Sequence, residues 1–348
     1  MHSTPLPSIL EIKQLFPLYP HHLQFIAESR IHAKAIMNGT DPRKAVIVGP
    51  CSIHDKKSAI EYAKRFKELS EKVGRSLFLV MRVYVEKPRT ITGWKGLIYD
   101  PHLDGSHDMQ TGLIWTRELL MALTEMKVPI ATEFVDPLTA YYFQDLITWG
   151  FIGARTSASQ PHRQLASALK IPIGFKNGTD GNLDNALHGI TSAKTSHCFM
   201  NVDEEGHLCA IQSDGNPWTH VVLRGSQELP NYDPRSVGMA LHKLSAMHLS
   251  PRLMIDCSHG NCQKDHEKQK IVFASIMEQM EQGNESIFGM MLESHLESGN
   301  QLLTEDPTLL KYATSITDPC IDWETTEELI YSTHDSFSPS FSSSSAGI

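Results

Sequence analysis

The chain has 348 residues, of which 41% are hydrophobic and 20% charged, a composition that excludes disorder and collagen-like repeats and allows a large core. Its 31 Lys and Arg against 40 Asp and Glu give a formal net charge of -9, so no general basic field draws it to nucleic acid or to a membrane surface. We therefore expect neither partner, and any anion site must be built locally.

The N-terminus lacks the basic and apolar regions of a signal peptide, and no stretch reaches about 18 apolar residues, so we expect a cytoplasmic protein. The six cysteines are too few and too irregularly spaced for a disulfide framework, and none form a CxxC pair. Reduced thiols are expected. A metal, if present, must be bound by residues from distant segments.

Short apolar runs alternate along the chain with segments of helical periodicity. Between the first two runs, 45–49 and 77–83, Ser58 and Glu61 have capping-box spacing and apolar residues recur at three- and four-residue steps up to Gly74. Six more runs follow, at 128–134, 150–155, 171–176, 220–225, 252–257 and 286–293. Eight strands with mostly helical connections predict an α/β fold, a parallel (β/α)8 TIM barrel.

Residues with chemically useful side chains lie at or just after the end of each run. In chain order they are Cys51, Arg82 with Lys87, Glu133, Arg155, Lys176, Arg224, His259 and Glu293. Barrel enzymes assemble their sites at the carboxyl-terminal ends of several strands, which all meet at one rim. This recurrence favours the barrel over the alternative that the length also allows, a two-domain doubly wound fold.

Three segments do not fit the repeat. Residues 1–40 are predicted to be an N-terminal extension for assembly or regulation, which precedes a catalytic barrel over 41–330. Within the barrel, residues 197–218 contain two alternating runs about a Gly-containing turn and are predicted to be an inserted β-hairpin. The Ser-rich tail, 331–348, is predicted to be disordered.

Six cations are expected at the rim of an otherwise acidic protein. They are Arg82, Lys87, Arg89, Arg155, Lys176 and Arg224. Any one alone could be a solvated surface residue, but six together indicate polyanionic substrates, and two separate phosphates would account for their number. The absence of GxxxxGK[ST], and of GxGxxG after a strand, argues against nucleotides.

A second group of residues suits a transition metal. Its members are Cys51, His259, Glu293 and Asp318. A thiolate, an imidazole and two carboxylates could hold such an ion with a position open to polarise a carbonyl group. Each residue also has an ordinary structural explanation, as a small buried hydrophobe, a core or loop histidine, or a surface acid.

Long motifs in the same order resemble the class I 3-deoxy-D-arabino-heptulosonate 7-phosphate (DAHP) synthases of the microbial, aromatic-amino-acid-regulated type. They are GPCSIHD (49–55), MRVYVEKPRTITGWKGLIYDP (81–101), GARTSASQPHR (153–163), GFKNGTDG (174–181), VVLRG (221–225), IDCSHGN (255–261), MLESHLESGNQ (291–301) and SITDPCIDWE (315–324). The resemblance covers about residues 10–330. It implies a metal-dependent transferase that condenses phosphoenolpyruvate, D-erythrose 4-phosphate and water to DAHP and phosphate, the first step of the shikimate pathway.

The resemblance also implies roles for individual residues. The ligands of one divalent metal ion (Mn, Fe, Zn or Co) would be Cys51, His259, Glu293 and Asp318. The phosphate and carboxylate of phosphoenolpyruvate would be held by Arg82, Lys87, Arg155, Lys176 and Arg224. Arg89 and Thr90 would bind erythrose 4-phosphate, while Lys87 and Glu133 would order the attacking water and move its proton. The family further implies a homodimer or homotetramer and a possible aromatic amino acid effector.

Three positions depart from the family pattern: Ala158 replaces an acid, Glu204 a lysine and Lys170 a small residue. The last two lie in the region of the effector pocket, so we expect weak or altered inhibition by phenylalanine and tyrosine. Two alternatives remain: the 8-phosphate synthase of 3-deoxy-octulosonate, disfavoured by the KPRT motif at 87–90, and a catalytically silent regulatory subunit, disfavoured because every matched site residue is retained.

Overall fold

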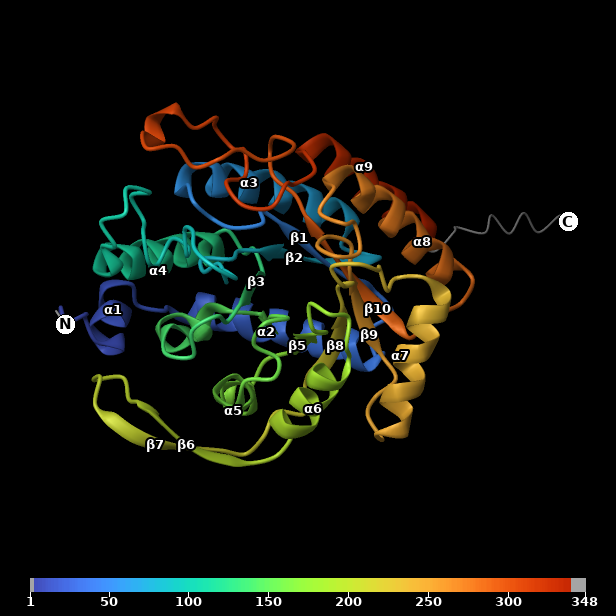
Figure 1. Cartoon of the computed structure of the whole chain (residues 1–348), viewed down its shortest axis with the longest axis horizontal. Coiled ribbons are helices and arrows are strands. Elements are labelled where there is room, and N and C mark those ends of the chain that lie inside the picture. The colour runs from blue at the N-terminus through green and yellow to red at the C-terminus, as the bar shows by residue number, and fades with distance from the viewer. Residues whose placement is uncertain (1–2, 339–348) are drawn as a thin grey trace, which may run out of the picture.

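The computed structural model describes residues 3–338 and shows a closed barrel of parallel strands (Figure 1). The first strand, β1 (Lys44–Gly49), pairs with both β2 (Leu77–Arg82) and β10 (Ile287–Glu293), which closes the barrel. The others are β3 (Ile130–Glu133), β4 (Trp149–Ile152), β5 (Ile173–Lys176), β8 (Thr219–Leu223) and β9 (Leu253–Asp256). All eight predicted strands are present, and the TIM barrel is confirmed.

Helices surround the barrel. They are α3 (Lys56–Val73), α4 (Met109–Glu125), α5 (Gln160–Ala168), α6 (Asp184–Ala193), α7 (Pro234–Ala246), α8 (Gln269–Glu281) and α9 (Trp323–Phe337). Between β3 and β4, where the structure describes every residue, the connection contains two short 3-10 helices, η1 (Thr139–Tyr142) and η2 (Gln144–Leu146), in place of an α-helix. The loops before α8 and α9 contain two more, η3 (His266–Lys268) and η4 (Pro307–Leu309).

The first barrel helix begins earlier than the capping-box spacing predicts. The N-cap of α3 is Asp55, whose carboxylate accepts hydrogen bonds from the backbone N–H groups of Lys57 and Ser58. Ser58 is buried inside the first turn, so the predicted box at Ser58 and Glu61 is wrong. Asp at the N-cap satisfies free N–H groups of the first turn, and this fixes the entry of the loop that follows β1.

The N-terminal extension contains α1 (Ile9–Leu15) and α2 (Pro20–Asn38). Three apolar residues of α2, namely Ala33, Ile36 and Met37, belong to the same buried cluster as Phe78 and Trp149 from the starts of β2 and β4. The helix therefore closes the amino-terminal end of the barrel. A site that admits substrate is left to the opposite, carboxyl-terminal end.

The predicted hairpin is formed by β6 (His197–Val202) and β7 (Leu208–Ser213), paired antiparallel. It curves away from the barrel and its tip lies beside α1 (Figure 1). There the N–H of Leu10 donates to the carbonyl of Glu204 over 2.7 Å, and Nζ of Lys13 lies 2.6 Å from the Glu204 carboxylate. The extension thus packs on its own barrel and its own hairpin.

The C-terminal helix runs into the segment predicted to be disordered. Residues 331–337 belong to α9 because this part of the helix is anchored: Thr333 is buried, and Nδ1 of His334 lies 2.6 Å from Oγ of Ser76. The boundary at 331 is therefore wrong, and the rest of the predicted tail, 339–348, lies outside the described residues. Among residues 3–338, no helix combines the length and hydropathy needed to cross a bilayer.

Candidate active site

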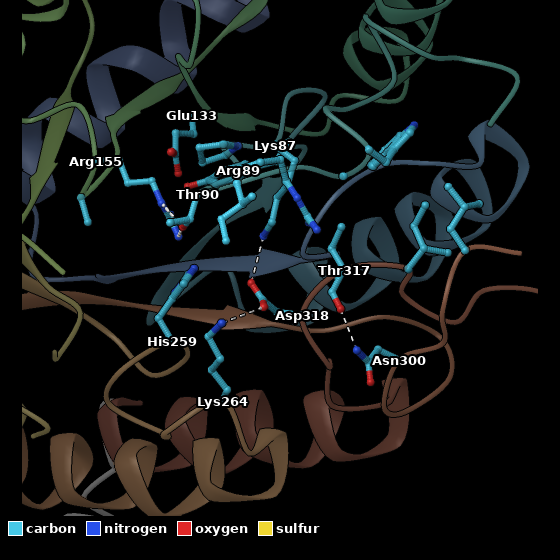
Figure 2. A pocket seen from close by; sticks show the side chains of 18 of the residues that line it. Lys87, Arg89, Thr90, Glu133, Arg155, His259, Lys264, Asn300, Thr317 and Asp318 are labelled. Atoms are coloured by element: carbon cyan, nitrogen blue, oxygen red, sulfur yellow. Dashed lines mark hydrogen bonds and ion pairs between the residues drawn. The ribbon is translucent and has the colours of Figure 1, made fainter. Parts of the chain in front are cut away.

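A cavity of about 530 Å³ opens at the carboxyl-terminal end of the barrel (Figure 2). Most of the predicted site residues line it: Arg82, Lys87, Arg89, Thr90, Glu133, Arg155, Lys176, Arg224, His259 and Asp318. The other two, Cys51 and Glu293, are buried just beneath and contact the wall through Lys87 and Arg82. The barrel therefore brings together every residue that the sequence proposed for the site.

The strands explain why these charges meet. Every second residue of a strand faces the barrel interior, and the inward row of β2 runs from Phe78 through Val80 to Arg82. The inward rows of β8 and β9 end in the same way, with Arg224 two residues after Val222 and Asp256 two residues after Met254. Apolar side chains fill the barrel, and each of these inward rows ends in a charged group, which lines the cavity (Arg82, Arg224) or lies buried beneath it (Asp256).

Three of the predicted metal ligands form one cluster. The Cys51 sulfur and carboxylate oxygens of Glu293 and Asp318 all lie within 4.8 Å of one another. Nζ of Lys87 lies 2.8 Å from the Cys51 Sγ and 3.0 Å from Oδ2 of Asp318, as Figure 2 shows for the carboxylate. The Lys87 ammonium thus lies where the thiol and the carboxylates converge. The same thiol and carboxylates are therefore suited to hold a metal cation.

Ionisation in this cluster follows from burial and charge. The Lys87 ammonium holds the pKa of Asp318 well below its usual range. Burial raises the pKa of the Cys51 thiol to about 12, and the Glu293 carboxylate adds to this effect. The thiol therefore keeps its proton at neutral pH unless a metal ion replaces it.

His259 lies at the edge of the cluster. Its Nε2 lies 3.5 Å from Oε1 of Glu293, and its Nδ1 lies 2.7 Å from Oγ of Ser258 and 2.9 Å from Oδ2 of Asp256. A carboxylate behind the imidazole is the usual arrangement around a metal-ligating histidine, because it fixes the orientation and tautomer of the ring. Asp256 is not among the site residues expected from the sequence, although its place near the end of the apolar run at 252–257 is the same kind of position that marked the others.

Two predicted anion-binding residues are deeply buried in the cavity wall. Lys176 is buried and its Nζ lies 3.1 Å from Oδ2 of Asp256. Arg224 is also buried, and the one hydrogen bond of its guanidinium to the described part of the chain goes to the carbonyl of Gly225. Burial lowers the pKa of this guanidinium, yet arginine stays charged, so most of its donors are available to an anion.

The other arginines have protein partners. Arg82 is fully buried and donates to Oε1 of Glu293 over 2.9 Å and to the carbonyl of Cys51 over 3.2 Å, so it positions a predicted metal ligand. Arg155 donates to Oγ1 of Thr90 from Nε and Nη2 over 3.1 and 2.9 Å (Figure 2). Arg155 is expected to bind phosphoenolpyruvate and Thr90 to bind erythrose 4-phosphate. Their contact therefore joins the two expected substrate sites.

Two further residues of the site were missed. A Cβ on Gly153 would lie 2.1 Å from Oε1 of Glu133, so glycine is needed there to leave room for this carboxylate. Lys264 lines the cavity with its Nζ 3.9 Å from Oδ1 of Asp318. It lies on the same loop as His259, and both have positive φ angles, 60° and 58°, which strained loops at functional sites often show.

Residues 24–330 match the family model described as the DAHP synthetase I family. The chain belongs to this family. It is 47% identical over 324 residues to the Tyr-sensitive phospho-2-dehydro-3-deoxyheptonate aldolase of Escherichia coli (strain K12). The aligned region covers 93% of this chain and 91% of that protein. The Trp-sensitive enzyme of the same strain is 45% identical over 320 residues, 92% of this chain and 91% of that protein.

A solved structure of the phospho-2-dehydro-3-deoxyheptonate aldolase from Francisella tularensis SCHU S4 superposes with a TM-score of 0.94 at 43% identity, covering 97% of this chain and 98% of that one. DAHP synthases condense phosphoenolpyruvate, erythrose 4-phosphate and water to DAHP and phosphate at the start of the shikimate pathway, and they use a divalent metal. The function predicted from the sequence is confirmed. The relatives favour this reaction over the octulosonate alternative.

Proposed function

We propose that the cavity divides into a metal site, a phosphoenolpyruvate site and an erythrose 4-phosphate site. The contact that carries this proposal is the Lys87 ammonium between the Cys51 sulfur and the Asp318 carboxylate, beneath a cavity lined by cations. It supports a cation site next to an anion site, which is what joining a phosphorylated aldehyde to phosphoenolpyruvate requires.

The metal ligands are Cys51, His259, Glu293 and Asp318. A divalent ion held there supplies Lewis acidity to the aldehyde oxygen of erythrose 4-phosphate. The mixed sulfur, nitrogen and oxygen set suits Mn, Fe, Zn or Co. Two residues outside the ligand set orient its members. Asp256 contacts His259, and Arg82 donates to Glu293, so each fixes the direction of one ligand.

Phosphoenolpyruvate is held by the cations Arg82, Lys87, Arg155, Lys176 and Arg224. The free donors of Arg224 and the buried ammonium of Lys176 support this assignment, because buried cations bind an oxyanion more strongly than exposed ones. Arg89 and Thr90 bind the phosphate of erythrose 4-phosphate. The Arg155–Thr90 hydrogen bonds hold the two substrate regions next to each other.

In the reaction, C3 of phosphoenolpyruvate attacks the aldehyde carbon, and water captures the cation that develops at C2. Phosphate then leaves with cleavage of its C–O bond. Lys87 and Glu133 order this water and move its proton, and both line the cavity. The cations hold two mutually repelling substrates side by side, so positioning supplies part of the rate enhancement.

We further infer a homodimer or homotetramer in the cytoplasm, under feedback control by an aromatic amino acid. The Tyr-sensitive and Trp-sensitive names of two relatives support this regulation. Lys170 is exposed just after α5, and Glu204, in the turn of the hairpin, is paired with Lys13, so these two of the three departures from the family pattern are charged groups. We therefore expect phenylalanine and tyrosine to inhibit weakly.

One assay tests the reaction. The purified chain, without any partner protein, should consume phosphoenolpyruvate with erythrose 4-phosphate and not with arabinose 5-phosphate. Consumption with arabinose 5-phosphate alone would indicate the octulosonate reaction. No consumption with either sugar, in a correctly folded and metal-loaded sample, would indicate a regulatory subunit.

A further inference from the structure

A second cavity, of about 650 Å³, lies outside the active site and shares no lining residue with it. It is bounded by the start of α3, the loop between β2 and α4, the side of α4 and the loop before α9. Much of its wall is apolar or aromatic: Leu97, Leu103, Trp115, Leu310 and Tyr312. A cavity of this size with such a wall has the character of a small-molecule site.

Two lysines in this cavity have no acidic partner. Lys57 and Lys311 line it, and within residues 3–338 neither ammonium has a carboxylate oxygen within 4.0 Å. Lys57 instead lies 5.7 Å from the centre of the Tyr312 ring. Lys56, by contrast, is paired with Glu118 over 2.5 Å.

The acids near the cavity are already bound. Asp55 accepts from two backbone N–H groups at the start of α3. Glu61 accepts from Arg65 and from the hydroxyl of Tyr312, and Glu118 from Lys56. The carboxylates near the cavity thus already accept hydrogen bonds, whereas the Lys57 and Lys311 ammonium groups have no ion-pair partner among the described residues.

A polar side chain at the base of the cavity lacks a partner. His54 lines the cavity and is 7% exposed, and its Nδ1 is buried without a hydrogen bond to the described part of the chain. Burial lowers the pKa of this imidazole, which is therefore neutral and can donate one N–H. An unsatisfied buried imidazole costs stability, and a ligand oxygen or a bridging water would relieve that cost.

We propose that this cavity is a second binding site, which takes a planar apolar ring carrying a carboxylate. Trp115, Tyr312 and the leucines would contact the ring, and Lys57 and Lys311 would pair with the carboxylate. An amino acid is disfavoured, because its ammonium group would face two lysines, and Asp55, the one acid in the wall, already accepts from two backbone N–H groups. This site does not depend on the roles proposed for the active-site residues.

The test is a titration of the full chain with 3-phenylpropionate, followed by saturation-transfer NMR, with phosphoenolpyruvate and Mn²⁺ present to occupy the active site. The matched probe is 3-phenylpropylamine, which has the same ring and the opposite charge. We expect the acid to bind and the amine to bind at least about tenfold more weakly.

Three variants locate the bound ring. Leu310→Trp puts a bulkier side chain into the cavity wall, and the double change Lys57→Ala/Lys311→Ala removes its unpaired ammonium groups, so each should weaken binding of the acid by about tenfold or more. Lys64→Ala is the control, because Lys64 is exposed on the same helix as Lys57 and does not line the cavity. Thermal melts and basal activity should be unchanged in all three.

Three results would overturn the proposal. One is no binding of the acid to the unmodified chain. Another is equal binding of the amine. The third is binding of the acid that neither Leu310→Trp nor the double lysine variant changes, since the ring would then lie elsewhere.

Discussion

Nζ of Lys87 lies 2.8 Å from the sulfur of Cys51, a buried thiol that also lies 3.7 Å from Oδ2 of Asp318. The same ammonium contacts Asp318, a residue 267 positions away from Cys51 in the chain. A side chain proposed to act on substrate water therefore also contacts two proposed metal ligands. Changes at the metal site and at Lys87 should affect each other.

Removal of the Cys51 sulfur should abolish metal binding without unfolding the protein. In Cys51→Ala we expect metal affinity to fall by more than about a hundredfold, because even residues behind a ligand set affect affinity by about 10- to 100-fold. The measurement is metal content after dialysis, with circular dichroism as the check on folding.

In the unmodified chain, chelation should abolish activity and Mn²⁺ should restore it. Full turnover after exhaustive chelation would exclude this ligand assignment.

The two anion sites should separate kinetically. Arg89→Ala should raise the apparent KM for erythrose 4-phosphate by about tenfold, because the substrate phosphate loses one charge-assisted hydrogen bond. The apparent KM for phosphoenolpyruvate should change less. Lys176→Ala should show the reverse. Arg155→Ala should affect both substrates, because Arg155 also holds Thr90. Identical effects of all three changes on both substrates would contradict the division.

A methyl group on Gly153 should disturb Glu133 selectively. In Gly153→Ala the added Cβ would lie 2.1 Å from Oε1 of Glu133, so the carboxylate must move and we expect kcat to fall by about 10- to 100-fold. The matched control is Gly238→Ala in α7, where nothing lies within 4 Å of the added Cβ. That change should leave kcat unaltered and stabilise the helix by about 0.5–1 kcal/mol. Unchanged kcat in Gly153→Ala would remove Glu133 from the reaction.

A buried acid behind the site should make stability depend on pH. Burial raises the pKa of Glu86 to about 8, from an ordinary value of 4.5. The folded state therefore holds this proton more tightly than the unfolded state, so the contribution of Glu86 is full below about pH 4.5 and is lost as pH rises through 8.

Glu86→Gln removes this titration. Relative to the variant, the unmodified chain should lose free energy of unfolding as pH rises from 4.5 to about 8, and the difference should level off above that. Urea unfolding of both proteins across this pH range gives the comparison. A difference that does not vary with pH would show that folding does not raise the pKa of Glu86.

The pair between α1 and the hairpin should contribute little to global stability and more to local order. Glu204→Lys places two cations together, while Lys13→Glu/Glu204→Lys restores an opposite pair. We expect a coupling energy of at most about 1 kcal/mol, because the pair is exposed. Amide exchange of residues 9–15 should be faster in the single variant and recover in the double one; equal exchange in all three proteins would mean that the Leu10 backbone bond alone holds α1.

The sequence alone predicted the barrel and the residues that gather at its carboxyl-terminal end. Eight apolar runs separated by mostly helical segments specify the strands, because each strand is buried on both faces, and a polar residue at the end of a buried run has only the rim to occupy. The family motifs then assigned Cys51, His259, Glu293 and Asp318 to one ion. Local patterns of this kind depend only on neighbours in the chain.

Only the tertiary structure decided which distant groups touch. The contacts of Lys87 with Cys51, of Asp256 with His259 and of Glu204 with Lys13 each depend on how the closed barrel and its attached segments bring separate loops together. Sequence spacing says that a residue lies at the rim, but not which neighbour it meets there. The same holds for the second cavity, whose wall comes from α3, α4 and two loops and exists only once they pack.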